Sequence, residues 1–266
     1  MYLRNCSIIL LKDFEQLLKG VVKLKPRLYF PDLLTKQVFN YKQSHHLKNV
    51  LRLKVGEKIF LFDGAGHEVT ATITVCDRKN VQFKLTEEVK AVDRENNNSA
   101  LIAQGLCQSS RMDYVIQKSV ELGAEVVAPI ITERCQVQHS NNSYLEKKLE
   151  RWKLIAEHAS QQCGRNKLAK IKSPQRFDEF VKTIKQKNSL NLILNPTSKK
   201  RLVEIDLSSE RTIVFLIGPE AGFSDSEELL AKKAGFQGVK LGKRILRTET
   251  VAVSLLSILN YVSDEF

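Results

Sequence analysis

The order of apolar segments after residue 99 constrains the fold of this chain more than any other feature. Short apolar runs of strand length alternate there with longer segments whose apolar residues recur at three- and four-residue spacings, as in amphipathic helices. Strands are expected at 100–106, 126–131, 190–194, 213–217 and 239–241, and helices at 113–122, 143–163, 224–234 and 251–262. Helices are the usual connections between parallel strands, so this order predicts an α/β domain with a mostly parallel sheet.

Residues 25–93 have a different pattern, in which apolar and polar residues alternate with period two. Strands are predicted at 58–62, 69–75 and 81–85, and Asp63–Gly66 has the glycines of a tight turn. Short strands joined by tight turns are typical of a small barrel with one face filled. This region is therefore expected to be a separate β-rich domain.

Two further segments complete the predicted domain organisation. Residues 94–99 contain no apolar residue and form the predicted linker to the α/β domain at 100–266. Residues 1–24 place Leu10, Phe14 and Leu17 at helical spacing and are predicted to form a helical N-terminal extension.

Charge and cysteine usage limit the class of protein. The 42 Lys and Arg residues exceed the 30 Asp and Glu residues, which gives a formal net charge of +12. Because this excess is spread along the chain, it suggests an anionic partner such as RNA or DNA, with a solvated basic surface as the alternative. The five cysteines are widely spaced and odd in number, which argues against a disulfide framework and a zinc site. No apolar run approaches the ~20 residues of a membrane span. We expect a cytoplasmic protein without a membrane anchor or a metal.

Three predicted strand ends carry the residues most suited to ligand binding. They are 194–196, 217–224 and 241–250, and the last two contain glycine. Ligands of open α/β sheets bind outside the carboxyl ends of the strands, where glycines let the backbone approach them closely. The chain has neither the GxGxxG of a dinucleotide site nor the GxxxxGK[ST] of a phosphate-binding loop. These segments predict a loop-built pocket with carboxylates and guanidiniums close by, and surface ion pairs are the alternative.

Two of these segments resemble a family signature. Ile217–Ser224, followed by Leu241–Thr250, resembles that of the RsmE family, SPOUT-class enzymes that methylate N3 of a uridine in 16S ribosomal RNA. The likeness covers the chain from about Arg27 to its end, and further matching motifs stand at 45–52, 62–66, 111–118, 121–123, 133–135 and 162–165. Ala221 departs from the pattern where a second glycine is usual, and Val251 where alanine is usual.

The resemblance implies a fold, a cofactor and partners. The fold would be a SPOUT methyltransferase domain with a C-terminal deep trefoil knot, preceded by a small PUA-like β-barrel. The cofactor would be S-adenosylmethionine, and the partners would be 16S ribosomal RNA in the 30S subunit and a second copy of the chain, with Val251–Val262 as the candidate dimer helix. By transfer, the cofactor pocket would be lined by Leu194, Asn195, Ile217, Gly218, Pro219, Glu220, Gly222, Leu241, Gly242, Ile245, Leu246 and Thr248.

The chemistry assigns candidate roles within this framework. Uracil N3 carries a proton, so transfer of a methyl group to it calls for a general base or for cations that stabilise the uracil anion. Glu249 is the candidate base, or else the residue that positions Arg247, and Arg247 is the candidate for stabilising the uracil oxygens. Arg111 and Arg165 are the other catalytic candidates, through phosphate contact or uracil stabilisation. Thr248 is expected to cap the last helix.

RNA contacts are expected from basic residues in both domains. They are Arg27, Lys48, Arg52, Lys54, Lys118 and Arg134. Two other functions are consistent with the same sequence: a non-catalytic rRNA-binding or ribosome-assembly factor that keeps the fold, and methylation of a different nucleobase.

Overall fold

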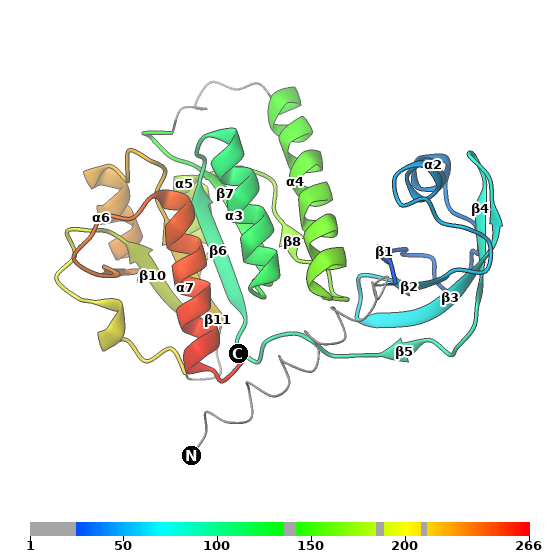
Figure 1. Cartoon of the computed structure of the whole chain (residues 1–266). Helices are drawn as coiled ribbons and strands as arrows, with labels where there is room; N and C mark the ends of the chain where they lie inside the picture. The colour runs from blue at the N-terminus through cyan, green and yellow to red at the C-terminus, as the bar shows by residue number, and fades with distance from the viewer. Residues whose placement is uncertain (1–24, 136–141, 185–188, 209–211) are drawn as a thin grey trace, which may run out of the picture. The chain divides into compact units, whose positions relative to one another are not determined.

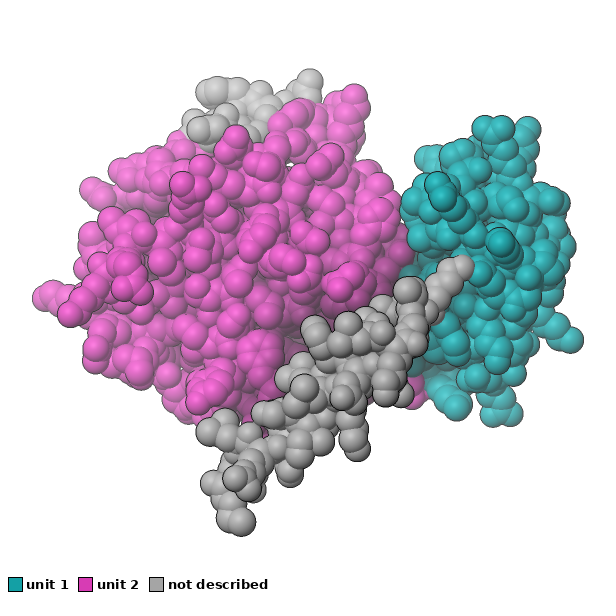
Figure 2. Space-filling model, in the orientation of Figure 1, with its two compact units in different colours: residues 1–62, 68–90 teal, residues 63–67, 91–266 magenta. Residues whose placement is uncertain are grey.

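The computed structural model describes residues 25–135, 142–184, 189–208 and 212–266, and divides the chain into two compact units (Figure 2). Unit 1 contains residues up to Phe62 together with Glu68–Lys90, and unit 2 contains Asp63–His67 and Ala91–Phe266. The predicted helix at 1–24 lies outside the described residues.

Unit 1 is built on one sheet with the order β1-β2-β3-β4, in which β5 also pairs with β3. The strands are β1 (Arg27–Tyr29), β2 (Lys58–Phe62), β3 (His67–Cys76), β4 (Val81–Leu85) and β5 (Lys90–Ala91), and helix α2 spans Tyr41–Asn49. The period-two pattern holds along β3 as far as Ile73. A register shift between Ile73 and Val75 then turns Cys76 inward in place of Val75.

The core of unit 1 is mostly aliphatic and contains three phenylalanines that pack against one another. The rings of Phe30, Phe39 and Phe83 lie 5.0–5.2 Å apart, and all three side chains are buried. Helix α2 begins with a capping box between Asn40 and Gln43, which fixes where the helix starts.

Unit 2 contains a seven-stranded parallel sheet with the order β12-β10-β11-β6-β7-β8, in which β9 pairs with β7. The strands are β6 (Ala100–Gly105), β7 (Val126–Ile131), β8 (Lys170–Ile171), β9 (Gln175–Arg176), β10 (Ser189–Leu194), β11 (Thr212–Ile217) and β12 (Gln237–Val239). The predicted α/β architecture with a parallel sheet is confirmed. Strands β8 and β9 were not predicted, because two residues are too few to show a periodic pattern.

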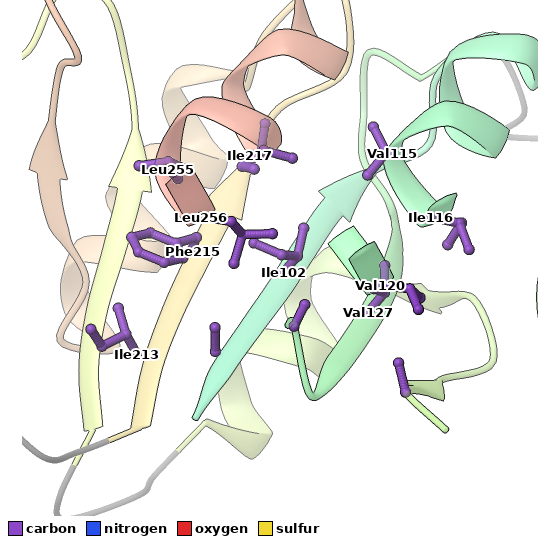
Figure 3. Packing of buried hydrophobic residues seen from close by; sticks show 14 of the residues in the cluster. Ile102, Val115, Ile116, Val120, Val127, Ile213, Phe215, Ile217, Leu255 and Leu256 are labelled. Carbon is purple, nitrogen blue, oxygen red and sulfur yellow. The ribbon is translucent and has the colours of Figure 1, made fainter. Parts of the chain in front are cut away.

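Helices cover both faces of this sheet (Figure 1). One face carries α3 (Ser109–Glu121), α4 (Asn142–Cys163) and α7 (Thr248–Val262), and the other carries α5 (Phe177–Thr183) and α6 (Asp225–Lys233). In Figure 3, Leu255 and Leu256 of α7 pack over Phe215 of β11 and Ile102 of β6. Burying a side chain of this size contributes about 1.5–3 kcal/mol relative to exposure, so this layer holds α7 against the sheet.

Helix α3 begins at Ser109, four residues before the predicted start. Asp113, the first residue of the predicted helix, lies inside the observed one, and its carboxylate accepts hydrogen bonds from Arg151 of α4. The first turn of α3 was not predicted because Ser109 and Ser110 are polar and do not continue the apolar pattern of the helix.

The predicted linker 94–99 is not an exposed connection throughout. Asn96 donates a hydrogen bond to Asn260 at 2.8 Å, and Asn98, which is buried, donates to Ser263 at 2.7 Å. Polar residues thus tie this segment to the end of α7. No helix in the described ranges combines the length and the apolar character needed to cross a bilayer.

Candidate functional site

A pocket of about 350 Å³ lies at the carboxyl ends of β10, β11 and β12. These strands are neighbours in the sheet and run in parallel, so the loops that follow them meet at one edge. All twelve residues predicted to bind the cofactor line this pocket, together with the catalytic candidates Arg111 and Arg247. The pocket is also lined by residues that were not among the predicted set, namely Pro196, Val239, Lys240, Arg244 and Val251. Each of these lies within three residues of a predicted residue, so the same strand ends place them.

The turn Gly218–Gly222 forms one wall of the pocket. The Gly222 N–H donates to Pro219 O at 2.9 Å and closes the turn, and Gly222 has φ +70°, a conformation that favours glycine. A Cβ on Gly218 would lie 3.2 Å from the Gly222 Cα, so this wall has little room for a side chain. Ala221 is not among the residues of positive φ, so the extra methyl at this departure from the family pattern is tolerated.

A buried polar latch, formed by Gln104 and Thr248, holds this turn. Thr248 Oγ1 donates to the Gly218 carbonyl at 2.6 Å, and Gln104 Nε2 donates to Thr248 Oγ1 at 2.8 Å and to Gly218 O at 3.3 Å. Gln104 is 0% exposed. Gly105 lets the turn come this close, because a Cβ there would lie 2.6 Å from Pro219.

The latch corrects the role predicted for Thr248. Its side chain does not cap α7; the N-cap position belongs to Arg247, which makes no side-chain cap hydrogen bond. The hydroxyl instead joins the start of α7 to the ends of β6 and β11. The sequence around Thr248 could not predict this role, because its partner Gln104 lies 144 residues away in the chain.

Arg111 lies between two carboxylates at the edge of the pocket. Its Nη1 donates to Glu220 Oε1 at 3.0 Å, and its Nε lies 3.8 Å from Glu249 Oε1. Glu220 also accepts from the Gln108 N–H at 3.0 Å, so this carboxylate holds the pocket turn against the start of α3. Glu249 Oε2 is buried and has no hydrogen-bond partner within the described ranges.

The two carboxylates also affect Cys107. Burial, and then the charges of Glu220 and Glu249, raise the pKa of the Cys107 thiol to about 12. A thiol with this pKa stays protonated at neutral pH and is a poor nucleophile. In this cluster the carboxylates can accept a proton and the guanidinium can donate hydrogen bonds, while the sulfur stays a neutral thiol.

Arg247 lines the pocket with an exposed side chain. Glu249 stands in the first turn of α7, where a carboxylate is favoured by the helix dipole. Among the described residues no ion pair joins these two, and the cation nearest Glu249 is Arg111. The prediction that Glu249 positions Arg247 therefore has no support in the geometry.

Arg165 does not reach this pocket, which corrects its assignment as a catalytic candidate. It is 5% exposed, it is ion-paired with Glu95, and it donates to the carbonyls of Val120 and Ala124 at 3.0 and 2.9 Å. These carbonyls belong to the end of α3 and the turn that follows it. Arg165 is thus a structural residue that satisfies carbonyl oxygens no longer bonded within the helix.

Three of the predicted RNA-binding residues are engaged within the chain. Arg27 is ion-paired with Glu68 at 2.7 Å, and Lys118 with Glu121 at 2.7 Å. Arg134 Nη1 donates to Phe223 O at 2.9 Å and supports the pocket turn. Their placement favours structural roles over RNA contact.

The other three, Lys48, Arg52 and Lys54, are exposed in unit 1 and have no ion-pair partner within the described ranges. Arg52 has φ 54°, in the left-handed region. His45 and His46 are also exposed there, and no group of three or more potential metal ligands occurs among the described residues.

Comparison with known proteins gives two family matches. Residues 94–260 match the model of an RNA methyltransferase domain, and residues 40–86 match that of an RNA methyltransferase PUA domain. Ribosomal RNA small subunit methyltransferase E of Buchnera aphidicola subsp. Acyrthosiphon pisum is 30% identical over 91% of this chain and 95% of its own length. The protein of that name from Synechocystis sp. is 34% identical over 82% of this chain and 70% of its own length.

Solved structures agree with these matches. A methyltransferase from Legionella pneumophila, in complex with the bound cofactor SAM, has a TM-score of 0.83 and 36% identity, over 89% of this chain and 97% of that one. Ribosomal RNA small subunit methyltransferase E from Neisseria gonorrhoeae, bound to S-adenosyl methionine, has a TM-score of 0.81 and 34% identity, over 90% of this chain and 98% of that one. The chain belongs to the family of ribosomal RNA small subunit methyltransferase E, the RsmE family that its motifs resemble.

Proposed function

We propose that this protein transfers a methyl group from S-adenosylmethionine to N3 of a uridine in the 16S ribosomal RNA of the small (30S) subunit, and so acts in the cytoplasm. One observation carries the proposal: three strand ends, two of which contain glycine, close around a single pocket that is also lined by Arg111 and Arg247. The names of the relatives support a small-subunit rRNA substrate, and the SAM-bound neighbours support the cofactor.

The pocket residues fit S-adenosylmethionine. A volume of about 350 Å³ lies within the range of about 300–1,000 Å³ that is usual for small-molecule sites. Leu194, Ile217, Leu241 and Leu246 offer apolar walls for an adenosine, while the backbone of the Gly218–Gly222 and Leu241–Gly242 segments offers polar groups. When bound, S-adenosylmethionine supplies an electrophilic methyl group.

The chain's residues prepare the uridine for that transfer. Glu249 has one buried carboxylate oxygen without a partner in the described part of the chain, which is the arrangement expected of a group that accepts the N3 proton. Arg111 beside it and Arg247 at the pocket wall donate hydrogen bonds to the uracil oxygens as the ring becomes anionic. The role of the protein is then to position and stabilise, with no covalent bond to the RNA.

The C-terminal segment forms a trefoil knot in this proposal. Leu202 and Leu207, in the connection between β10 and β11, are buried in the same cluster as Leu255 and Leu256 of α7. Helix α7 also packs directly against β11. This shared burial supports the proposed knot, in which α7 would pass between the connection and the sheet and so thread the tail through a loop.

The remaining parts of the proposal concern the domains and the assembly. Residues 25–93 act as a PUA-like RNA-binding barrel, 94–99 join it to the SPOUT domain at 100–266, and the protein works as a homodimer. The exposed side chains of Ile258, Tyr261 and Val262 on the apolar helix α7 support a second copy of the chain as its partner.

The experiment has two measurements. Calorimetry tests for S-adenosylmethionine binding, and failure of the purified protein to bind would overturn the proposal. Mapping of modified nucleotides in 16S rRNA from a strain lacking this enzyme, with and without the wild-type gene, tests the reaction. Cofactor binding without any rRNA modification would identify a non-catalytic rRNA-binding or assembly factor, and modification at another base would identify a different methyltransferase.

A further inference from the structure

One rim of the pocket is made by two basic segments that pair with each other. The Lys240 N–H donates to Lys200 O at 3.0 Å, and the Leu202 N–H donates to Lys240 O at 2.9 Å. This pairing joins the loop after β10 to the chain leaving β12. The cations of these two segments are Lys199, Lys200, Arg201, Lys240, Lys243 and Arg244, which we call the basic rim.

The basic rim has little internal compensation for its charge. Arg201 is ion-paired with Glu204 at 2.9 Å, and Lys200 donates to the neutral side chain of Gln237. The pKa of Glu204 is lowered, chiefly by the hydrogen bond from Arg201 and also by the charge of Lys200, so this carboxylate stays ionised. Within the described ranges no carboxylate is ion-paired with the remaining cations of the rim. Gathering like charges in this way is unfavourable unless an anion binds there.

The rim adjoins the site of the proposed reaction. Lys240 and Arg244 both line the pocket, while Lys199 and Lys243 are exposed and lie outside its lining. Ile245, which follows Arg244, is 82% exposed. A base that enters the pocket must leave its stack, and the phosphates beside it then lie at the pocket edge.

We infer that the basic rim binds the RNA phosphates that flank the uridine whose base enters the pocket. This inference rests on the proposed function, and it names a surface of this chain that the predicted RNA-binding residues do not include. Lysines suit the task because an ammonium binds a phosphate without a fixed orientation. The contacts also offset part of the free energy needed to extrude the base.

The test is the double substitution Lys199→Gln/Lys243→Gln, measured by binding to single-stranded oligouridine over a series of salt concentrations. Each lost phosphate contact lowers the slope of log K against log salt by about 0.7, so the double variant is expected to lose about 1.4. The same relation predicts binding about 20-fold weaker at ~0.1 M salt. S-adenosylmethionine affinity should not change, because neither lysine lines the pocket.

The matched control is Lys232→Gln/Lys233→Gln. These lysines are exposed in the last turn of α6, and the helix spans nine residues from its start near the pocket turn. At ~1.5 Å per residue they lie more than 10 Å along the helix axis from that start. The control removes the same charge from a helix that contributes no residue to the pocket or to the rim, so it reports the effect of net charge.

The inference is supported if only the rim variant loses affinity and salt dependence while it keeps its S-adenosylmethionine affinity. Equal losses in both double variants would overturn it in favour of a general charge effect, and unchanged RNA binding would exclude phosphate contact. Unchanged RNA binding together with weaker binding to intact small subunits would point instead to a ribosomal protein. Failure of the wild type to bind S-adenosylmethionine would overturn the proposed function, and the oligouridine measurement would still test the rim.

Discussion

Arg111 and Arg165 were both catalytic candidates from the sequence, and the two regions of unit 2 that they occupy differ in what surrounds the guanidinium. Arg165 is buried, and its donors are taken by Glu95 and by two carbonyls. Arg111 is partly exposed at the pocket edge, where Glu220 holds only one of its nitrogens. The difference shows that an arginine serves a ligand when the fold leaves some of its donors unsatisfied, and serves the fold when it does not.

The largest effect that would test this contrast is on stability. Arg165→Ala leaves Glu95 in a mostly buried site without its partner, and loss of one member of a buried pair costs about 3–5 kcal/mol. The free energy of unfolding, from denaturant titration, should fall by this amount. S-adenosylmethionine affinity of the folded fraction should stay within twofold, and a selective loss of affinity with normal stability would return Arg165 to the catalytic candidates.

Arg247→Ala should show the opposite behaviour. Its side chain is exposed, so little change in the free energy of unfolding is expected, while the rate at saturating cofactor should fall about 100-fold, as for loss of a donor to a developing anion. Methyl transfer to rRNA under single-turnover conditions provides the measurement. Arg247→Lys is the control that keeps the charge, and full activity of the alanine variant would remove the proposed role.

Substitution in the latch is expected to affect both stability and ligand binding, because the latch is a buried structural contact that also holds the pocket wall. Thr248→Val removes two buried hydrogen bonds, from Thr248 to Gly218 O and from Gln104 to Thr248, and each contributes about 0.5–1.5 kcal/mol. S-adenosylmethionine affinity should fall about tenfold as the wall loosens, with a smaller change in the rate at saturation. Thr248→Ser keeps the hydroxyl and should bind as the wild type does; calorimetry that finds Thr248→Val equal to Thr248→Ser would contradict the latch.

The smallest effect concerns Cys107 and pH. Its pKa is raised from 9.0 to about 12 in the folded protein, so the neutral thiol stabilises the fold below pH 9, and this contribution is lost as pH rises from 9 toward 12. At pH ~10 the loss is about 1 kcal/mol. Unfolding free energies of the wild type and of Cys107→Ala, compared between pH 8 and ~10, should show a shallower decline in the variant; parallel declines would mean that the thiol is not shifted.

The pocket residues could be predicted from the sequence because they all lie close to the carboxyl ends of parallel strands. Parallel strands end at the same edge, so residues after β10, β11 and β12 had to meet once the strands were recognised. Ile217, Gly218 and Leu241 were found in this way and by the family motif, and the structure brings them together.

Contacts between distant segments could not be predicted from local pattern. The strand pattern around Gln104 predicts that this residue is buried but does not indicate its hydrogen-bond partner. Its pairing with Thr248 depends on how α7 packs against the sheet. The structural role of Arg165 was missed for the same reason. The carbonyls to which it donates, those of Val120 and Ala124, lie at the end of α3, more than 40 residues earlier in the chain. The basic segment Lys199–Arg201 passed unnoticed, since its significance comes from its pairing with Lys240.

The Gly218 carbonyl has a consequence for ligand design. A carbonyl oxygen has two lone pairs, and here both face donors supplied by Thr248 and Gln104. An inhibitor that carries an extra amino group toward this oxygen should therefore gain no affinity from it. Selectivity is better sought from groups directed at Arg111 or at the partnerless oxygen of Glu249, where the protein still has hydrogen-bonding capacity to offer.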